Sequence, residues 1–121
     1  MGRILVVDDD RGMAATIGAA LEFGGHQVQI AHDGRTAIAL YRQAPADLVI
    51  TDIYMPDKDG IETILELRDE CPGVKIIAIS GGGAFRFDQL PEAGLLGAQR
   101  VLAKPLDLDR MLEAVRELLD S

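Results

Sequence analysis

The chain has 121 residues, of which 12 are Lys or Arg and 20 are Asp or Glu, so its formal net charge at pH 7 is −8. This length suits one domain of ordinary size, and a hydrophobic content of 48% excludes an intrinsically disordered chain. The acidic balance argues against a nucleic-acid-binding protein, which would carry a basic face, and leaves cation binding, basic protein partners and simple solubility open.

The first half of the chain alternates between apolar runs and amphipathic segments. An apolar run at residues 4–7 predicts a strand, and the helical spacing of residues 13–21 predicts a helix that ends at a Gly-Gly pair. A second strand is predicted at residues 28–31, where alternating polar residues indicate a sheet edge. A helix that ends at an Ala-Pro pair and a third strand at residues 48–50 follow.

The second half continues the same alternation. A helix around residues 61–68 ends at a Pro-Gly pair, and continuous apolar runs predict strands at residues 76–79 and 101–103. Residues 81–97 open with three glycines and contain a proline, so we expect a short or irregular helix there. The last helix follows Asp107, a candidate N-cap. Five βα units in succession predict a parallel sheet with helices on both faces.

Targeting signals are missing from the apolar pattern. A secretory signal needs an apolar stretch of about 7–15 residues, whereas the first run turns acidic after four residues. No run approaches the roughly 18 residues of a membrane span. Cys71 is the single cysteine and cannot form an internal disulfide, so we expect a reducing, cytoplasmic location and a packing role for Cys71 beside its turn.

Polar side chains follow four of the predicted strands at the point where each strand ends. The first strand runs into Asp8-Asp9-Asp10 and the third into Asp52, while Ser80 and Lys104 follow the fourth and fifth. Because ligands bind beyond the carboxyl ends of parallel strands, we expect these groups to converge at one edge of the sheet.

This combination of groups suits phosphoryl chemistry with a divalent cation. Clustered carboxylates repel one another unless a cation lies between them, and a set of oxygen donors without His or Cys favours Mg²⁺, with Mn²⁺ as the alternative. Lys104 offers a positive charge, and Ser80 a hydroxyl, to a phosphoryl group. Asp52 has the chemistry of a nucleophile that forms an aspartyl phosphate.

Four segments together resemble the receiver domain of two-component response regulators, the fold of the chemotaxis response regulator. The resemblance covers nearly the whole chain and depends on VVDDD at residues 6–10, TDIYMPDKDG at residues 51–60, ISG at residues 79–81 and KP at residues 104–105. It implies a flavodoxin-like α/β fold, a doubly wound five-stranded parallel sheet in the order 2-1-3-4-5.

The resemblance also implies a role for each site residue. The metal ligands would be the carboxylates of Asp8, Asp9 and Asp52 and the backbone carbonyl of Tyr54. Asp52 would be the phosphoacceptor, and the phosphoryl group would be contacted by Ser80, the switch hydroxyl, and by Lys104. The family's bond between this lysine and the following proline is cis, so we expect a cis peptide at Lys104-Pro105.

Neighbouring residues have plainer interpretations. Asp10 is expected to cap a helix rather than bind metal. We expect His26 and His32 to be solvated loop residues that do not face the carboxyl edge and do not act as phosphorelay histidines.

The predicted function is a stand-alone receiver domain spanning residues 1–121, with no output domain. A histidine kinase or a phosphotransfer protein would supply the phosphoryl group, and output would pass through protein contacts, without nucleic acid or membrane. The chain would catalyse its own phosphorylation and dephosphorylation and turn over no external substrate. Three alternatives stay open: a receiver cut from a longer regulator, a small aspartyl-phosphate phosphohydrolase, disfavoured because Tyr54 replaces the expected second acid, and a flavodoxin-like cofactor binder, disfavoured by the acidic first loop.

One position departs from the family and leads to a prediction. Many receivers carry Tyr or Phe three residues before the lysine, and this chain has Val101. A valine cannot swing inward behind the switch hydroxyl, so we expect weak coupling of phosphorylation to the fifth strand. Backbone amide chemical shifts of residues 100–103 should stay nearly unchanged on phosphorylation, and large concerted shifts would contradict this expectation.

Overall fold

The computed structural model describes residues 2–53, 60–80 and 98–120, and for Gly60, Ile61 and Ser80 it describes the backbone alone. The predicted short helix within residues 81–97 therefore lies outside the described residues. Among the described segments, none forms a helix with the length and apolar character that crossing a membrane requires.

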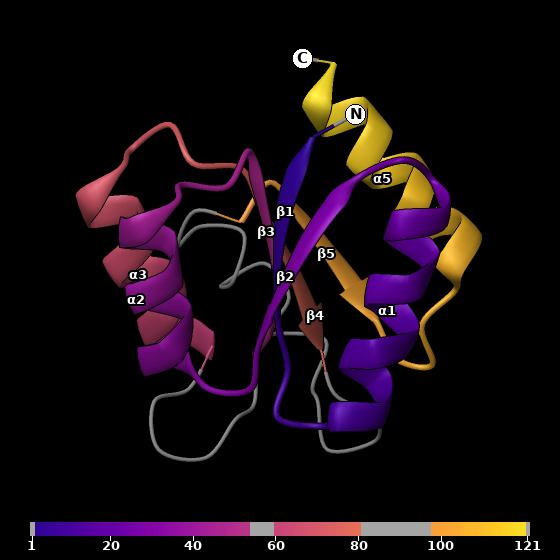
Figure 1. Ribbon diagram of the computed structural model, residues 1–121, viewed down its shortest axis with the longest axis horizontal. Coiled ribbons are helices and arrows are strands. Elements are labelled where there is room, and N and C mark those ends of the chain that lie inside the picture. The colour runs from indigo at the N-terminus through magenta and orange to yellow at the C-terminus, as the bar shows by residue number, and fades with distance from the viewer. Residues whose placement is uncertain (1, 54–59, 81–97, 121) are drawn as a thin grey trace.

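Five parallel strands form a single sheet in the order β2-β1-β3-β4-β5, which confirms the predicted topology (Figure 1). The strands exceed the predicted runs by one or two residues: β1 (Arg3–Val7), β2 (Gln27–Ala31), β3 (Leu48–Asp52), β4 (Ile76–Ser80) and β5 (Arg100–Ala103). The order places β1 between β2 and β3, and β4 between β3 and β5. All strands therefore present their carboxyl ends at one edge, at the bottom of Figure 1.

The two edge strands, β2 and β5, differ in how clearly their own residue patterns indicate an edge position. The alternating pattern of β2 correctly predicted an edge strand. β5 is the other edge, as the predicted order 2-1-3-4-5 requires, and Val101 on it is only half-buried. The apolar run at residues 101–103 carried no edge signal of its own, because three residues are too short a run for its period to separate an edge strand from a central one.

Two layers of helices cover the sheet (Figure 1). The helices α2 (Gly34–Gln43) and α3 (Gly60–Glu70) lie on one face, and α1 (Arg11–Phe23) and α5 (Leu108–Leu119) lie on the other. Successive strand residues point to opposite faces, so Leu5 and Val7 of β1 join the core under α2 and α3, whereas Ile4 and Val6 join the core under α1 and α5. Burial of each large aliphatic side chain contributes about 1.5–3 kcal/mol, and the two cores together hold the strand ends in place.

Aspartate side chains cap the N-termini of three helices, α1, α2 and α5. Asp10 Oδ1 accepts a hydrogen bond from Met13 N at 3.0 Å, and Asp107 Oδ1 accepts from the backbone N–H groups of residues 109 and 110, which confirms both predicted caps. Asp33 Oδ1 accepts from Thr36 N at 2.7 Å. Each cap satisfies backbone donors that a helix leaves unpaired, and so fixes where the loop from the preceding strand enters the helix.

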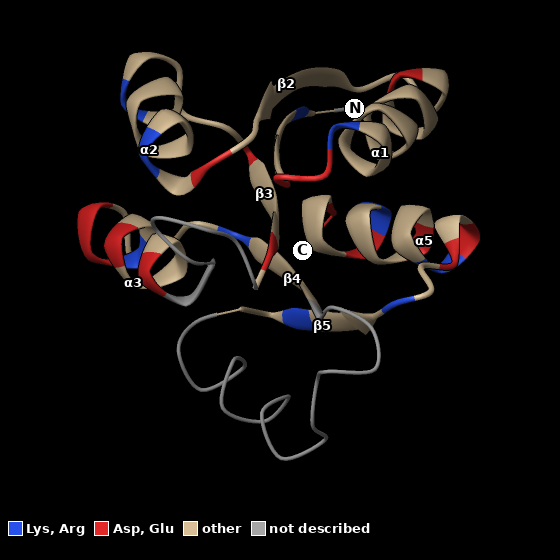
Figure 2. Cartoon of the chain, turned by 90° about the horizontal axis from the view of Figure 1, so that it is seen from below, with Lys and Arg blue, Asp and Glu red and all other residues tan. Residues whose placement is uncertain are grey.

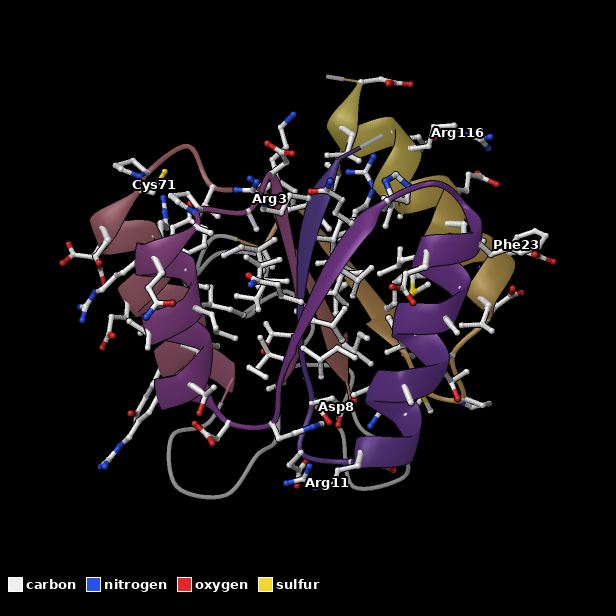
Figure 3. All side chains as sticks on the ribbon, in the orientation of Figure 1. Arg3, Asp8, Arg11, Phe23, Cys71 and Arg116 are labelled. Carbon is white, nitrogen blue, oxygen red and sulfur yellow. The ribbon has the colours of Figure 1, made fainter. Side chains whose placement is uncertain are left out.

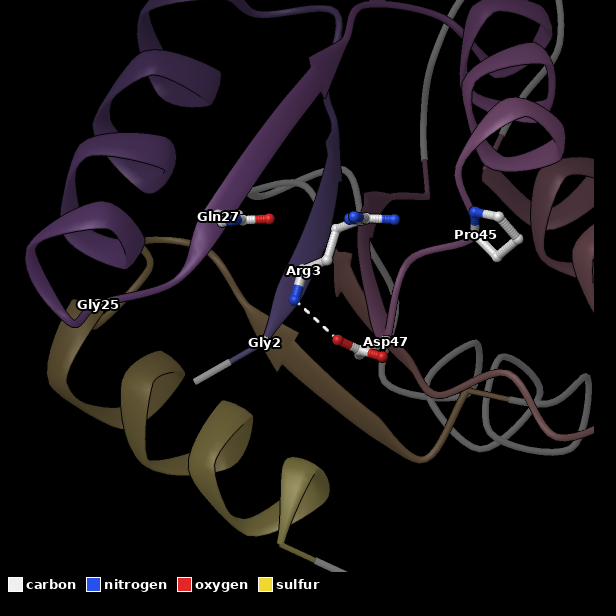
Figure 4. Close-up of a pocket in the computed structure, with 6 residues that line it drawn as sticks. All are labelled: Gly2, Arg3, Gly25, Gln27, Pro45 and Asp47. Atoms are coloured by element: carbon white, nitrogen blue, oxygen red, sulfur yellow. Dashed lines mark hydrogen bonds between the residues drawn. The ribbon is translucent and has the colours of Figure 1, made fainter.

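The amino edge of the sheet is closed by backbone-to-side-chain hydrogen bonds. Arg3 N donates to Asp47 Oδ2 at 2.8 Å in a pocket at this edge (Figure 4). His26 is half-buried and its Nδ1 accepts from Gly2 N at 3.1 Å, so the prediction of a solvated residue was wrong there. Burial and the N-terminal charge lower the pKa of His26. Cys71, directly after α3, is half-buried against the core under α2 and α3, as predicted (Figure 3).

The cap of α2 provides a test of how this loop is held. The backbone hydrogen bond from Thr36 lowers the pKa of Asp33, so the ionised cap stabilises the fold above the ordinary pKa of an aspartate and loses this effect as the pH falls through the lowered value. We expect Asp33→Ala to cost about 1 kcal/mol of unfolding free energy at pH 7, and less as the pH falls through the lowered pKa of Asp33. Urea unfolding measures both. Asp33→Asn, an equally good cap, should retain the stability at pH 7, and a loss equal to that of alanine would refute the capping role.

Candidate functional site

The first two acidic residues follow β1 directly. Asp8 N donates to Ala31 O at 3.0 Å, which extends the pairing of β1 with β2 by one residue. This places the Asp8 side chain inside the molecule, with 1% of its surface exposed, and leaves Asp9 exposed at the start of the loop. The strand therefore fixes one carboxylate below the surface and the other at it.

Asp52 is the last residue of β3 and is 3% exposed. Because β3 lies beside β1, Asp52 comes close to the acids that follow β1. One carboxylate oxygen from each of Asp8, Asp9 and Asp52 can be chosen so that all three lie within 4.8 Å of one another. Figure 2 shows acidic segments after β1 and at the end of β3 facing the same space. The predicted convergence of these three carboxylates is confirmed.

Lys104 joins this group from the end of β5. Its Nζ donates to Asp52 Oδ2 at 3.1 Å, and the bond between Lys104 and Pro105 is cis, as expected. Burial lowers the pKa of the Lys104 ammonium, but the hydrogen bond to Asp52 and the charges of Asp52 and Asp8 outweigh it, so that the pKa is raised. The lysine is therefore a permanent positive charge next to Asp52.

The Asp8 carboxylate is buried, and its two oxygens have different surroundings. Burial raises its pKa to about 6; the Asp10 N–H donating to Asp8 Oδ1 at 2.9 Å opposes the shift, and the charge of Asp52 adds to it. The other oxygen, Asp8 Oδ2, is buried and has no hydrogen-bond partner among the described residues. A buried carboxylate oxygen without a partner is costly, and a cation is the partner that would satisfy it.

The donor set fits a hard divalent cation. Asp8, Asp9 and Asp52 offer carboxylate oxygens, which Mg²⁺ prefers, and Asp8 Oδ2 is a ready acceptor. Two other predicted site residues are not placed as fully. Tyr54 lies outside the described residues, and Ser80 ends β4 beside Ala103 of β5, with its side chain outside the description.

His32 belongs to this edge, contrary to the prediction. It is half-buried, and its Nδ1 lies 3.0 Å from the backbone carbonyl oxygen of Asp8. The sequence could not predict this contact of His32, because a hydrogen bond to a main-chain carbonyl requires no particular residue type in the partner. The one available signal was its position directly after a predicted strand, which is where the other site residues lie.

Comparisons with known proteins agree with this geometry. The family model of the response regulator receiver domain matches residues 4–116. The response regulator MprA of Mycolicibacterium vanbaalenii is 38% identical over 120 residues, which cover 97% of this chain and 50% of that protein. MprA of Mycobacterium tuberculosis is 36% identical with the same coverage. The chain thus spans about half the length of these curated relatives.

Solved structures show the same fold. A CheY-like response regulator receiver domain protein from Methanospirillum hungatei superposes with a TM-score of 0.91 at 30% identity, covering 99% of this chain and 94% of the other. The receiver domain of NtrX from Brucella abortus superposes with a TM-score of 0.91 at 28% identity, covering 98% of each. Because the family model matches residues 4–116 and the fold and acidic site agree with it, the chain belongs to the response regulator receiver domain family.

Proposed function

We propose that this receiver domain accepts a phosphoryl group onto Asp52 in a Mg²⁺-dependent reaction and passes the signal on through protein contacts. The observation that supports this most directly is the group formed by Asp8, Asp9 and Asp52 with the Lys104 ammonium on Asp52. The donor would be a phosphohistidine of a sensor kinase or of a phosphotransfer protein, in keeping with the family. Asp8, Asp9, Asp52 and the backbone carbonyl of Tyr54 would hold the metal.

Each site residue has a separate role in the phosphoryl transfer step. A carboxylate oxygen of Asp52 attacks phosphorus, the N–P bond of the phosphohistidine breaks, and the imidazole leaves with the electron pair. Lys104 stays beside Asp52 and offsets negative charge on the transferred group, and the Ser80 hydroxyl would donate a hydrogen bond to it. When bound, Mg²⁺ supplies further positive charge to the phosphoryl oxygens. Water later attacks the aspartyl phosphate and returns the free Asp52 carboxylate and inorganic phosphate, so the domain catalyses its own phosphorylation and dephosphorylation.

The same proposal covers the organisation of the protein. We place residues 1–121 in one receiver domain that acts alone in the cytoplasm, bound by its kinase and by a target protein and by neither nucleic acid nor membrane. A second form, in which this receiver is one domain of a longer regulator, is supported by the two MprA relatives, of which the chain covers 50%. The phosphorylation chemistry is the same in both forms.

Phosphorylation of Asp52 is tested with a small phosphodonor such as acetyl phosphate. Intact mass should show one phosphoryl adduct in the presence of Mg²⁺, and none for Asp52→Asn or with the metal chelated. Asp69→Asn, which changes an exposed aspartate of α3, should be labelled like the wild type. An adduct that persists in Asp52→Asn, or that forms equally without metal, would overturn the assignment.

The buried charge of Asp8 predicts a conflict between function and stability. With metal chelated, the folded protein keeps a proton on Asp8 between about pH 4 and pH 6, where the unfolded chain has already released it. Stability should therefore fall as the pH rises through this window, by at most about 3 kcal/mol. Asp8→Asn removes this loss, so in EDTA at about pH 8 it should unfold at a higher urea concentration than the wild type, yet bind Mg²⁺ poorly.

Asp9→Asn is the matched control, because Asp9 is exposed and belongs to the same ligand set. It should weaken Mg²⁺ binding while leaving the stability of the metal-free protein nearly unchanged. Saturating Mg²⁺ should stabilise the wild type, since only the folded state presents the site. A metal-free Asp8→Asn protein less stable than the wild type at this pH would contradict this account.

A further inference from the structure

His32 sits where β2 gives way to α2. The residue before it, Ala31, is buried at the end of β2, and the residue after it, Asp33, caps α2 through Thr36. The backbone of His32 is therefore held on both sides, and the residue is half-buried. A side chain on so fixed a base can set the geometry of what it touches.

The ring touches the backbone of a predicted metal ligand. His32 Nδ1 lies 3.0 Å from the carbonyl oxygen of Asp8, and because a carbonyl only accepts, Nδ1 must carry the hydrogen. Asp8 N already donates to Ala31 O. In a longer parallel strand, the backbone N–H of residue 33 would donate to this same carbonyl. The imidazole supplies a donor at that place although the chain has turned into α2.

The carbonyl in question belongs to the peptide group that joins Asp8 to Asp9. This group is planar, so a hydrogen bond to its oxygen fixes its rotation and with it the directions in which the two side chains leave the backbone. The hydrogen bond from Asp10 N to Asp8 Oδ1 then sets which oxygen of Asp8 stays available, namely Oδ2.

We propose that His32 is a positioning residue for the metal site: its Nδ1–H holds the peptide between Asp8 and Asp9 so that both carboxylates meet Mg²⁺. This inference rests on the proposed function. His32 acts through Asp8 and is not itself a ligand, since the group of ligating atoms among the described residues contains three aspartates and no histidine. Groups that orient metal ligands typically account for a factor of about 10–100 in metal affinity.

Three substitutions separate this role from mere packing. His32→Asn places an amide nitrogen on Cγ, as Nδ1 is, and retains the donor. His32→Gln moves the nitrogen one bond further out, and His32→Ala removes it. The matched control is His26→Ala, which removes a half-buried histidine at the other end of β2, where Nδ1 accepts from Gly2. Each variant is measured for unfolding free energy in EDTA and for its Mg²⁺ Kd from amide shifts of residues 8–10.

The expected result concerns the Kd, whatever happens to stability. His32→Ala and His32→Gln should raise the Mg²⁺ Kd by about tenfold or more, and His32→Asn should stay within about threefold of the wild type. His26→Ala should leave the Kd unchanged. A Kd for His32→Ala within about twofold of the wild type, or rescue by Gln as good as by Asn, would overturn the inference. Failure of the wild type to bind Mg²⁺ would instead remove the proposed function, and this inference with it.

A spectroscopic measurement tests the hydrogen bond itself. At about pH 8, where imidazoles are ordinarily neutral, ¹⁵N–¹H correlation spectra report which ring nitrogen carries the hydrogen. The two histidines should differ, with the hydrogen on Nδ1 of His32 and on Nε2 of His26, whose Nδ1 accepts. A hydrogen on Nε2 of His32 would exclude the bond to Asp8 and the positioning role.

Discussion

The constraint on which this structure depends is the burial of two negative charges side by side at the carboxyl edge of the sheet. Asp8 and Asp52 are almost inaccessible to solvent, and burial together with the charge of Asp52 raises the pKa of Asp8 to about 6. Lys104 offsets part of this charge through its ion pair with Asp52. The remaining negative charge creates a negative potential at the buried carboxyl edge, where solvent screens it weakly. A divalent cation binds well under this condition. An edge built only for stability would have apolar groups there, so the cost itself indicates a functional site.

The fold maintains this arrangement by preventing the charges from separating. Because β1 and β3 are neighbours in the sheet, their carboxyl ends place Asp8 and Asp52 together. Lys104 follows β5, which is not a neighbour of β3, so its side chain reaches past the end of β4 to Asp52. Apolar cores on both faces fix the strands, and capped helices fix the loops that leave them. Relief of the repulsion through a rearranged backbone would therefore disrupt packing on both faces of the sheet.

Much of this could be predicted from the sequence, because strand ends in a parallel sheet are easy to locate. Continuous apolar runs gave β1, β3 and β4, and the residues that follow them gave Asp8, Asp9 and Asp52. The edge position of β5 followed from the family's strand order alone, since Val101 and its neighbours form an apolar run too short to show a period. His32 was misjudged. Its contact is with a main-chain atom of a residue 24 positions away, and such a contact places no demand on the type of its partner.

The hydrogen bond between His32 and the Asp8 carbonyl has a structural explanation that bears on how the site is built. Strand β2 ends at Ala31, the residue that pairs with Val7 at the end of β1, because Asp33 already caps α2. The sheet therefore offers no backbone donor to the Asp8 carbonyl, and the His32 side chain donates to it instead. A backbone donor could be changed only by shifting the whole strand, whereas a side chain can be exchanged without altering the sheet. The residue that follows the carboxyl end of β2 is thus a position where the geometry of the acidic site can vary while the fold stays the same.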